Sequence, residues 1–100
     1  MTEEKRTEKE FTQRVNESQG IIHKVCRMYC DDEIHRKDLF QEIVLQLWKS
    51  YSSFRGESNF SSWMYRVALN VAIQDFRKEK KRKYLFLESL YPSDEPIFQS

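Results

Sequence analysis

Five residues between positions 63 and 81 carry the side-chain types that bind nucleic acid. If residues 60–82 form a helix, its rotation of about 100° per residue brings the five into one line between two apolar faces. They are Trp63, Arg66, Asn70, Arg77 and Lys81. An aromatic ring stacks on bases, an amide hydrogen-bonds base edges, and cations neutralise phosphates. The line indicates a nucleic-acid interface, although Trp63 taken alone is more typical of a core aromatic.

The segment before this helix strengthens that interpretation. Residues 52–59, SSFRGESN, form an expected loop in which Gly56 permits tight backbone geometry. Its aromatic, cationic and small polar side chains are Phe54, Arg55, Ser58 and Asn59. Ser58 or Asn59 can cap the following helix. A loop of this composition suits an unstacked base.

A second exposed surface is expected on the helix of residues 33–51. One side of this helix holds a core stripe of Leu39, Phe40, Ile43, Val44 and Leu47. The opposite side carries Asp38, Gln41, Glu42 and Leu45. Hydrogen-bonding groups there surround an aliphatic side chain, which suits the docking of a partner helix. Single exposed apolar residues are also ordinary on solvated surfaces, so the pattern leaves both interpretations open.

A metal or redox site is the alternative that two cysteines raise. His23, Cys26 and Cys30 share one side of the first expected helix, and His35 is the obvious candidate for a fourth ligand. Cysteines at the edge of an apolar face in a cytoplasmic chain are usually reduced core residues. We therefore expect no bound metal and no cofactor.

Composition and charge distribution narrow the function further. The net charge is +1, yet the charge is unevenly distributed. Residues 55–83 hold eight Lys or Arg against three Asp or Glu, whereas residues 84–100 hold three acidic residues and no basic residue. A basic segment in a balanced chain suggests a polyanion partner. We find no nucleophile–base set, phosphate loop or paired carboxylates in an apolar pocket, so no enzymatic activity is expected. The absence of a long apolar run favours a cytoplasmic chain without membrane insertion.

The elements that position these residues are all helical. With two glycines and two prolines in 100 residues, the composition favours an all-α fold of three helices. The first runs from about Glu4 to Tyr29, where Gly20 weakens the helix without breaking it. The second runs from about Glu33 to Tyr51 after an N-cap at Asp31 or Asp32, and the third from about Phe60 to Arg82. Beyond Tyr84 the periodicity is lost and Pro92 and Pro96 break helices.

The residues from Asp38 to Arg82 closely resemble the second conserved region of bacterial RNA polymerase sigma factors, and most of all the extracytoplasmic-function (ECF) group of the sigma-70 family. The DLFQE element, the FRGES loop and the WMYRVALN series occur in order at appropriate spacing. The resemblance implies a three-helix bundle of the region 2 type. It divides the chain into a charged extension (1–10), a region 2 domain (11–83) and an acidic linker (84–100) that leads to a second domain outside this sequence.

The resemblance also implies two binding surfaces. Asp38, Leu39, Gln41 and Glu42 would dock on the clamp helices of the largest polymerase subunit, and the helical pattern adds Leu45. The loop and the following helix would capture the non-template strand of the promoter minus-ten element. The residues implied there are Phe54, Arg55, Ser58, Trp63, Arg66 and Asn70, to which the basic segment adds Arg77, Lys78, Lys80 and Lys81. An anti-sigma factor is a further partner, and a polymerase-independent single-strand-binding helical module is the alternative function.

Overall fold

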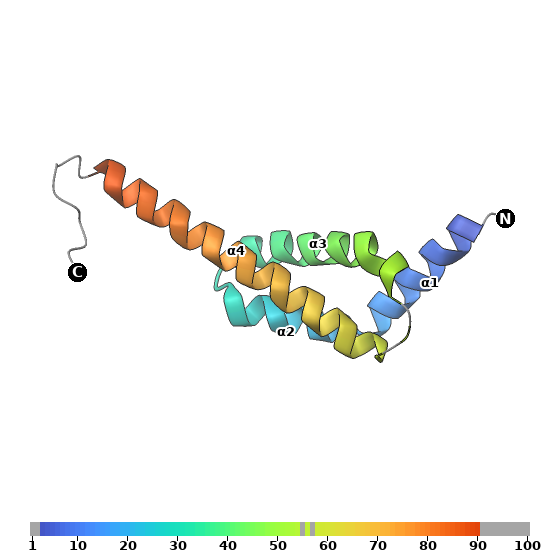
Figure 1. The fold of residues 1–100 in the computed structure, drawn as a ribbon. Coiled ribbons are helices and arrows are strands. Elements are labelled where there is room, and N and C mark those ends of the chain that lie inside the picture. The colour runs from blue at the N-terminus through green and yellow to red at the C-terminus, as the bar shows by residue number, and fades with distance from the viewer. Residues whose placement is uncertain (1–2, 55, 57, 91–100) are drawn as a thin grey trace.

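The computed structural model describes residues 3–54, 56 and 58–90, with side chains from Thr7 onward. Its elements in chain order are α1 (Glu3–Glu17), α2 (Gln19–Tyr29), α3 (Glu33–Ser50), the short 3-10 helix η1 (Tyr51–Ser53) and α4 (Phe60–Leu90). The described part contains no strand, which confirms the expected all-α fold. In Figure 1, α2, α3 and α4 lie side by side as a bundle, while α1 and the last turns of α4 extend from its opposite ends.

The first helix is not continuous, and the expectation of one helix from Glu4 to Tyr29 was wrong at Ser18. The Ser18 amide bonds to the Val15 carbonyl (3.1 Å), and the Ile21 amide bonds to the Ser18 carbonyl (3.0 Å). Both bonds span three residues, which tightens the backbone into a turn between α1 and α2. Asn16, Ser18 and Gly20 are poorer helix formers than most of their neighbours, so interrupting the helix costs least in this segment.

The start of α3 follows from one side chain. Asp32 takes the N-cap position, and its carboxylate accepts a hydrogen bond from the His35 backbone amide at 3.0 Å. This bond satisfies an amide that has no partner within the helix. The expected cap at the Asp31–Asp32 pair is therefore confirmed at the second residue, and it fixes the first turn of α3 against the end of α2.

The core is formed along one stripe of each helix, as the apolar periodicity predicts. The most deeply buried side chains are Ile22 and Val25 of α2, Leu39, Ile43 and Leu47 of α3, and Met64, Ala68 and Ala72 of α4. Phe11 and Val15 of α1 and the two cysteines complete it. No polar or charged residue is buried among the residues with described side chains. The interior of the bundle is therefore held by apolar packing.

The fourth helix extends further than the sequence pattern predicts. It continues to Leu90, whereas we expected it to end near Arg82 and to be followed by a linker. Leu, Phe and Glu between positions 85 and 90 are compatible with a helix, and the first proline comes only at position 92. Residues 80–90 are all exposed, so this end of α4 leaves the bundle as a single helix (Figure 1). The rest of the expected linker, residues 91–100, lies outside the described residues.

Candidate functional site

The loop before α4 is fixed at both of its ends. After η1, the Phe54 amide bonds to the Tyr51 carbonyl at 3.0 Å. At the other end, Asn59 Oδ1 accepts a hydrogen bond from the Ser62 amide at 2.8 Å, which caps α4 as expected. Between them Gly56 has φ of +74°, a left-handed conformation that glycine adopts without a steric cost. The described residues on either side of the loop are therefore fixed by these hydrogen bonds.

Aromatic rings from the loop and α4 form one cluster. The ring centroids of Phe54 and Trp63 are 5.0 Å apart, and Phe60 lies 5.4 Å from Trp63 and 5.8 Å from Phe54. Trp63 is half-buried. It can therefore serve both as a core aromatic and as a nucleic-acid contact, the two roles that the sequence left open. Edges and faces of these rings are the surfaces on which an unpaired base can stack.

The first helix contributes a cation to this cluster. The Arg14 guanidinium lies 5.3 Å from the centroid of the Phe60 ring and 5.9 Å from that of Phe54, within the range of cation–π attraction. Tyr51 also joins, 6.2 Å from Trp63. Sequence analysis missed Arg14, Tyr51 and Phe60. The spacing of Tyr51 and Phe60 around the loop could have indicated them, whereas Arg14 is 40 residues away from Phe54 and has no local signal.

Two of the predicted nucleic-acid ligands are in direct contact. The Arg66 guanidinium donates a hydrogen bond to Ser58 Oγ at 3.1 Å, and Arg66 is an exposed residue with further N–H donors. Asn70 lies one turn further along α4 and is exposed. Arg55, a predicted loop contact, lies outside the described residues. The described part of the predicted line thus begins at the loop and follows the exposed side of α4.

Basic residues of the predicted line and its neighbours follow along α4. Arg77 and Lys81 of the line, and Lys78 and Lys80 beside it, are all exposed. Next to them, the Arg82 guanidinium pairs with Glu79 at 2.9 Å across one helical turn. Exposed cations on a projecting helix contact phosphates without the cost of desolvating a buried charge. This end of α4 can therefore supply affinity that does not depend on sequence.

The predicted docking surface of α3 is divided between two grooves. Asp38 and Glu42 line a groove of about 570 Å³ between α3 and α4, whose other wall includes Asn70 and Lys78. Gln41 and Leu45 line a second groove of about 530 Å³ between α1 and α3. The two predicted interfaces thus meet in the first groove, a proximity that the separate helical patterns did not indicate.

Leu39 does not share the exposure of its neighbours. Its side chain is 1% exposed and packs in the core, whereas Leu45 is 45% exposed beside Trp48. The core stripe of α3 includes Leu39, which explains its burial. Leu39 nevertheless lines the groove between α3 and α4 together with Asp38 and Glu42, so the partner contact expected of it stays a prediction, while Leu45 with Trp48 supplies the more exposed apolar area.

Comparison with known proteins assigns the chain to a family. Residues 15–82 match the family model described as Sigma-70 region 2. The match runs from the end of α1 through α2, α3 and the loop to Arg82 of α4, so it includes the basic residues of that helix. The chain belongs to the sigma-70 region 2 family. The expected region 2 bundle is thereby confirmed. Both walls of the groove between α3 and α4 lie within the matched residues.

Curated relatives of this region 2 domain are ECF sigma factors, which confirms the expected group. SigW of Bacillus subtilis is 31% identical over 67 residues, covering 67% of this chain and 36% of SigW. The sigma-E factor of Haemophilus influenzae is 37% identical over 60% of this chain and 27% of its own length. SigG of Mycobacterium tuberculosis is 35% identical over 46% of this chain. The chain spans well under half the length of these relatives. No solved structure gave a significant match.

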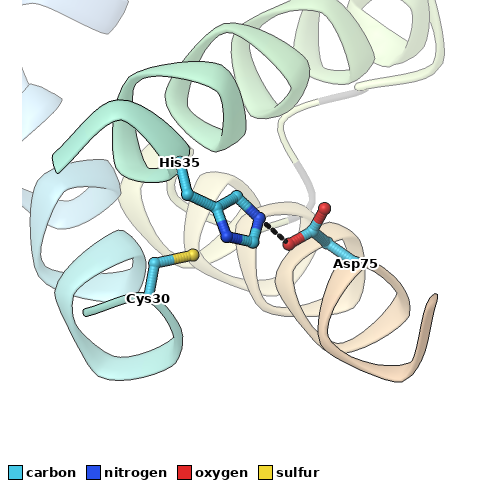
Figure 2. A group of neighbouring side chains, drawn as sticks. All are labelled: Cys30, His35 and Asp75. Carbon is cyan, nitrogen blue, oxygen red and sulfur yellow. Dashed lines mark hydrogen bonds and ion pairs between the residues drawn. The ribbon is translucent and has the colours of Figure 1, made fainter. Parts of the chain in front are cut away.

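The region 2 bundle also brings together groups from three helices at its far end from the loop. Ligand atoms of Cys30, His35 and Asp75 all lie within 4.8 Å of one another (Figure 2). His23 is not among them, because its ring stacks on Phe40 with a centroid distance of 4.6 Å. The metal hypothesis was therefore wrong in including His23, and it missed Asp75, which is 40 residues from His35.

Both cysteines of the region 2 domain are buried and reduced. Burial raises the pKa of the Cys26 thiol to about 11, and the negative charge of a Cys30 thiolate contributes in the same direction. Burial and the Asp75 carboxylate raise the pKa of the Cys30 thiol in the same direction. Both thiols are therefore neutral at physiological pH, as expected of core cysteines.

Within the described residues, no helix is long and apolar enough to span a membrane.

Proposed function

We propose that this chain is the promoter-opening domain of an ECF sigma factor. It binds the RNA polymerase core through the exposed residues of α3 and captures the non-template strand of the minus-ten element through the loop and α4. The observation that carries this proposal is the groove between α3 and α4, whose walls hold Asp38 and Glu42 on one side and Asn70 on the other. A DNA strand bound on α4 would therefore lie directly beside a polymerase surface bound on α3.

The partner of α3 is proposed to be the clamp-helix coiled coil of the largest polymerase subunit. Asp38, Gln41 and Glu42 are exposed, so they can accept hydrogen bonds from a basic helix without prior unfolding. Leu45 and Trp48, 45% and 39% exposed, provide an apolar area at the edge of the same helix. Polar groups around an exposed apolar centre are the usual composition of a protein–protein interface.

Capture rather than active unwinding accounts for the strand opening. Separating a duplex costs about 1.4 kcal/mol per base-pair step in stacking. Stacking of an unpaired base on an aromatic side chain returns about 1 to 3 kcal/mol. The half-buried Phe54 and Trp63 supply such rings, and Arg66 reaches the loop beside them. The domain therefore needs no catalytic residue.

A selection experiment tests this function. A pool of single-stranded DNA with a randomised central segment is bound to the chain alone, to polymerase core alone and to the two together. We expect enrichment of a defined sequence only by the complex. Enrichment by the chain alone to the same degree would favour the polymerase-independent module, and no enrichment beyond that of core alone would contradict the proposal.

A further inference from the structure

Three potential metal ligands converge where α2 ends, α3 begins and α4 passes. Cys30 follows the last residue of α2, His35 lies in the first turn of α3, and Asp75 lies midway along α4. Their ligand atoms are within 4.8 Å of one another. Figure 2 shows the Cys30 sulfur and the Asp75 carboxylate both directed toward the imidazole of His35.

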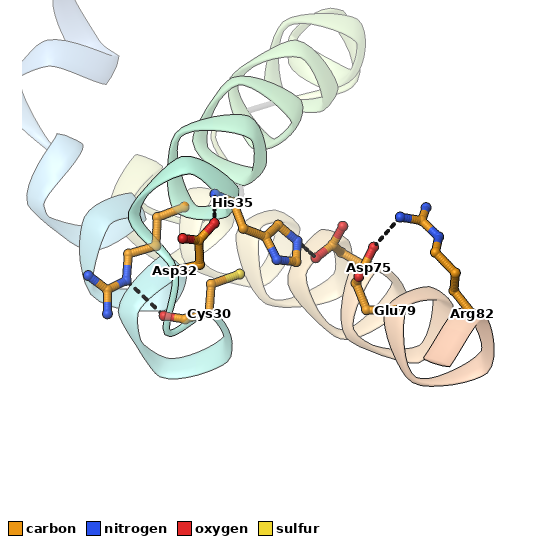
Figure 3. Close-up of polar contacts among 7 residues, drawn as sticks. Cys30, Asp32, His35, Asp75, Glu79 and Arg82 are labelled. Atoms are coloured by element: carbon orange, nitrogen blue, oxygen red, sulfur yellow. Dashed lines mark hydrogen bonds and ion pairs between the residues drawn. The ribbon is translucent and has the colours of Figure 1, made fainter. Parts of the chain in front are cut away.

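The backbone that carries two of these residues is held in place by polar contacts (Figure 3). The Arg36 Nε donates a hydrogen bond to the Cys30 carbonyl at 2.7 Å, and the Asp32 carboxylate accepts one from the His35 amide at 3.0 Å. The His35 ring is itself within 2.8 Å of Asp75 Oδ2. These contacts hold the group together without a metal, so that little ordering is required when an ion binds.

The ligand set has the chemistry of a zinc site. Thiolate, imidazole and carboxylate are the three protein ligands that zinc takes, with bonds of about 2.0 to 2.3 Å in a tetrahedral arrangement. Such bonds place ligand atoms roughly 3.3 to 3.7 Å apart. The widest separation in the group, up to 4.8 Å, must therefore contract by about 1 Å, while His35 Nε2 and Asp75 Oδ2, now 2.8 Å apart, must move apart to bind one ion. His35 and Asp75 have side chains 30% and 29% exposed, which leaves them room to move.

Charge balance also favours a divalent ion. A Cys30 thiolate and the Asp75 carboxylate carry two negative charges, which a divalent cation neutralises in a site with one fully buried ligand. Binding releases the thiol proton and any proton shared between His35 and Asp75. The Arg36 cation acts on the pKa of the Cys30 thiol in the opposite direction to burial and Asp75, because it favours the thiolate form that ligates a metal.

We propose that Cys30, His35 and Asp75 form a zinc site that joins the three helices of the bundle. The three protein ligands leave a fourth position for water, as in open zinc sites. Cys26 does not belong to the group of ligand atoms that share this spacing. Because Asp75 also lines the groove between α3 and α4, an ion at this site would fix one end of that groove.

The test uses the full 100-residue chain, purified with a chelator and then dialysed free of it. Zinc is titrated by calorimetry, and cobalt replaces it as a spectroscopic probe because a cobalt–thiolate bond gives a charge-transfer band. We expect one equivalent of metal, a thiolate band, and a rise in the unfolding temperature with zinc concentration. No saturable binding, or saturation without the thiolate band, would overturn the proposal.

Variants separate this site from adventitious binding. Loss of a partner in the outer shell of a metal costs about 10- to 100-fold in affinity, so Cys30→Ser and Asp75→Asn should each cost at least that much. Asp75→Asn preserves shape at a half-exposed position, and circular dichroism checks that both variants fold. His23→Ala is the matched control and should bind zinc as tightly as the unaltered chain. Equal affinity in Asp75→Asn and the control, or loss of binding in His23→Ala, would contradict the proposal.

Discussion

The Arg66 guanidinium donates a hydrogen bond to the Ser58 hydroxyl at 3.1 Å, which connects the loop before α4 to the second turn of that helix. This contact holds a cation against the loop before any nucleic acid is present. A side chain that is already ordered loses less entropy when it binds a phosphate or a base.

We therefore expect Ser58→Ala to weaken binding of a selected single strand by the polymerase complex. Freeing one long side chain costs about 0.5 to 1.5 kcal/mol on binding, which is up to about tenfold in affinity. Fluorescence anisotropy of a labelled oligonucleotide measures the change. Ser61→Ala, the same substitution at an exposed position of α4, is the control. Equal effects of the two substitutions would show that the contact does not prepare the site.

Reversal of one charge on α3 should weaken polymerase binding. Glu42 is exposed and makes only a long contact of 3.5 Å with Gln46, so Glu42→Lys should leave the fold intact. Placing like charges at an interface costs several kcal/mol, and we expect a loss of about 2 kcal/mol, or roughly thirtyfold. Adding Gln41→Ala should weaken binding further. Glu17→Lys makes the same charge change on α1, and core affinity that is unaltered relative to this control would remove the docking assignment.

Phosphate contacts and base contacts on α4 should separate by salt and by sequence. The double variant Lys80→Ala, Lys81→Ala should weaken binding of all strands similarly and reduce the slope of log affinity against log salt, because fewer counterions are released. Asn70→Ala should instead reduce discrimination among minus-ten sequences by about 1 to 3 kcal/mol with an unchanged slope. Both are measured on polymerase complexes with oligonucleotides. If Asn70→Ala weakened every sequence equally, this residue would position the strand without reading it.

The N-cap of α3 should contribute measurably to stability. Asp32→Ala removes the acceptor of the His35 amide, and losing such a cap costs about 1 kcal/mol. In a domain of this size the unfolding temperature should fall by about 4 to 8 °C. Thermal unfolding in the presence of a chelator measures the cap alone. Asp31→Ala, the neighbouring carboxylate that does not cap, should leave the temperature nearly unchanged, and an equal fall in both variants would argue against the cap.

The buried Cys26 thiol should make the fold sensitive to alkali. Its pKa rises from 9.0 to about 11 on folding, so the folded chain holds this proton more tightly than the unfolded chain. The resulting stabilisation is complete below pH 9 and is lost as the pH rises toward 11; over this whole range it amounts to about 3 kcal/mol. Urea unfolding at a series of pH values should show this decline. In Cys26→Ala the decline should be shallower, and an identical slope would exclude the thiol as its cause.

Local features of the fold could be predicted because each depends on residues close in sequence. Asp32 and Asn59 are short polar side chains directly before apolar periodic segments, and both cap helices. The core stripes follow from the helical repeat alone. The turn at Ser18 was missed because a serine tolerates both helix and turn, and tertiary packing of Phe11 against Trp48 and Tyr51 decides the direction of α1.

Contacts between distant residues could not be predicted in the same way. Arg14 reaches the aromatic cluster, and Asp75 meets His35, only because the bundle places different helices in contact. A wheel of one helix contains no information about which turn of another helix lies opposite. The wheel of α3 placed Leu39 correctly in the core stripe, but it did not show that this residue would also line the groove toward α4.

The unbroken length of α4 has a consequence for the extent of nucleic acid that this chain can contact. Trp63 and Lys81 lie on one helix, and at 1.5 Å per residue their separation along its axis is roughly 27 Å. At about 3.4 Å per nucleotide of a stacked strand, this corresponds to a footprint of roughly eight nucleotides. A kink or an inserted residue between them would rotate or shift the basic end relative to the loop. In the proposed function, the helix would therefore set a constant distance between a base bound at the loop and the phosphates bound by the basic residues.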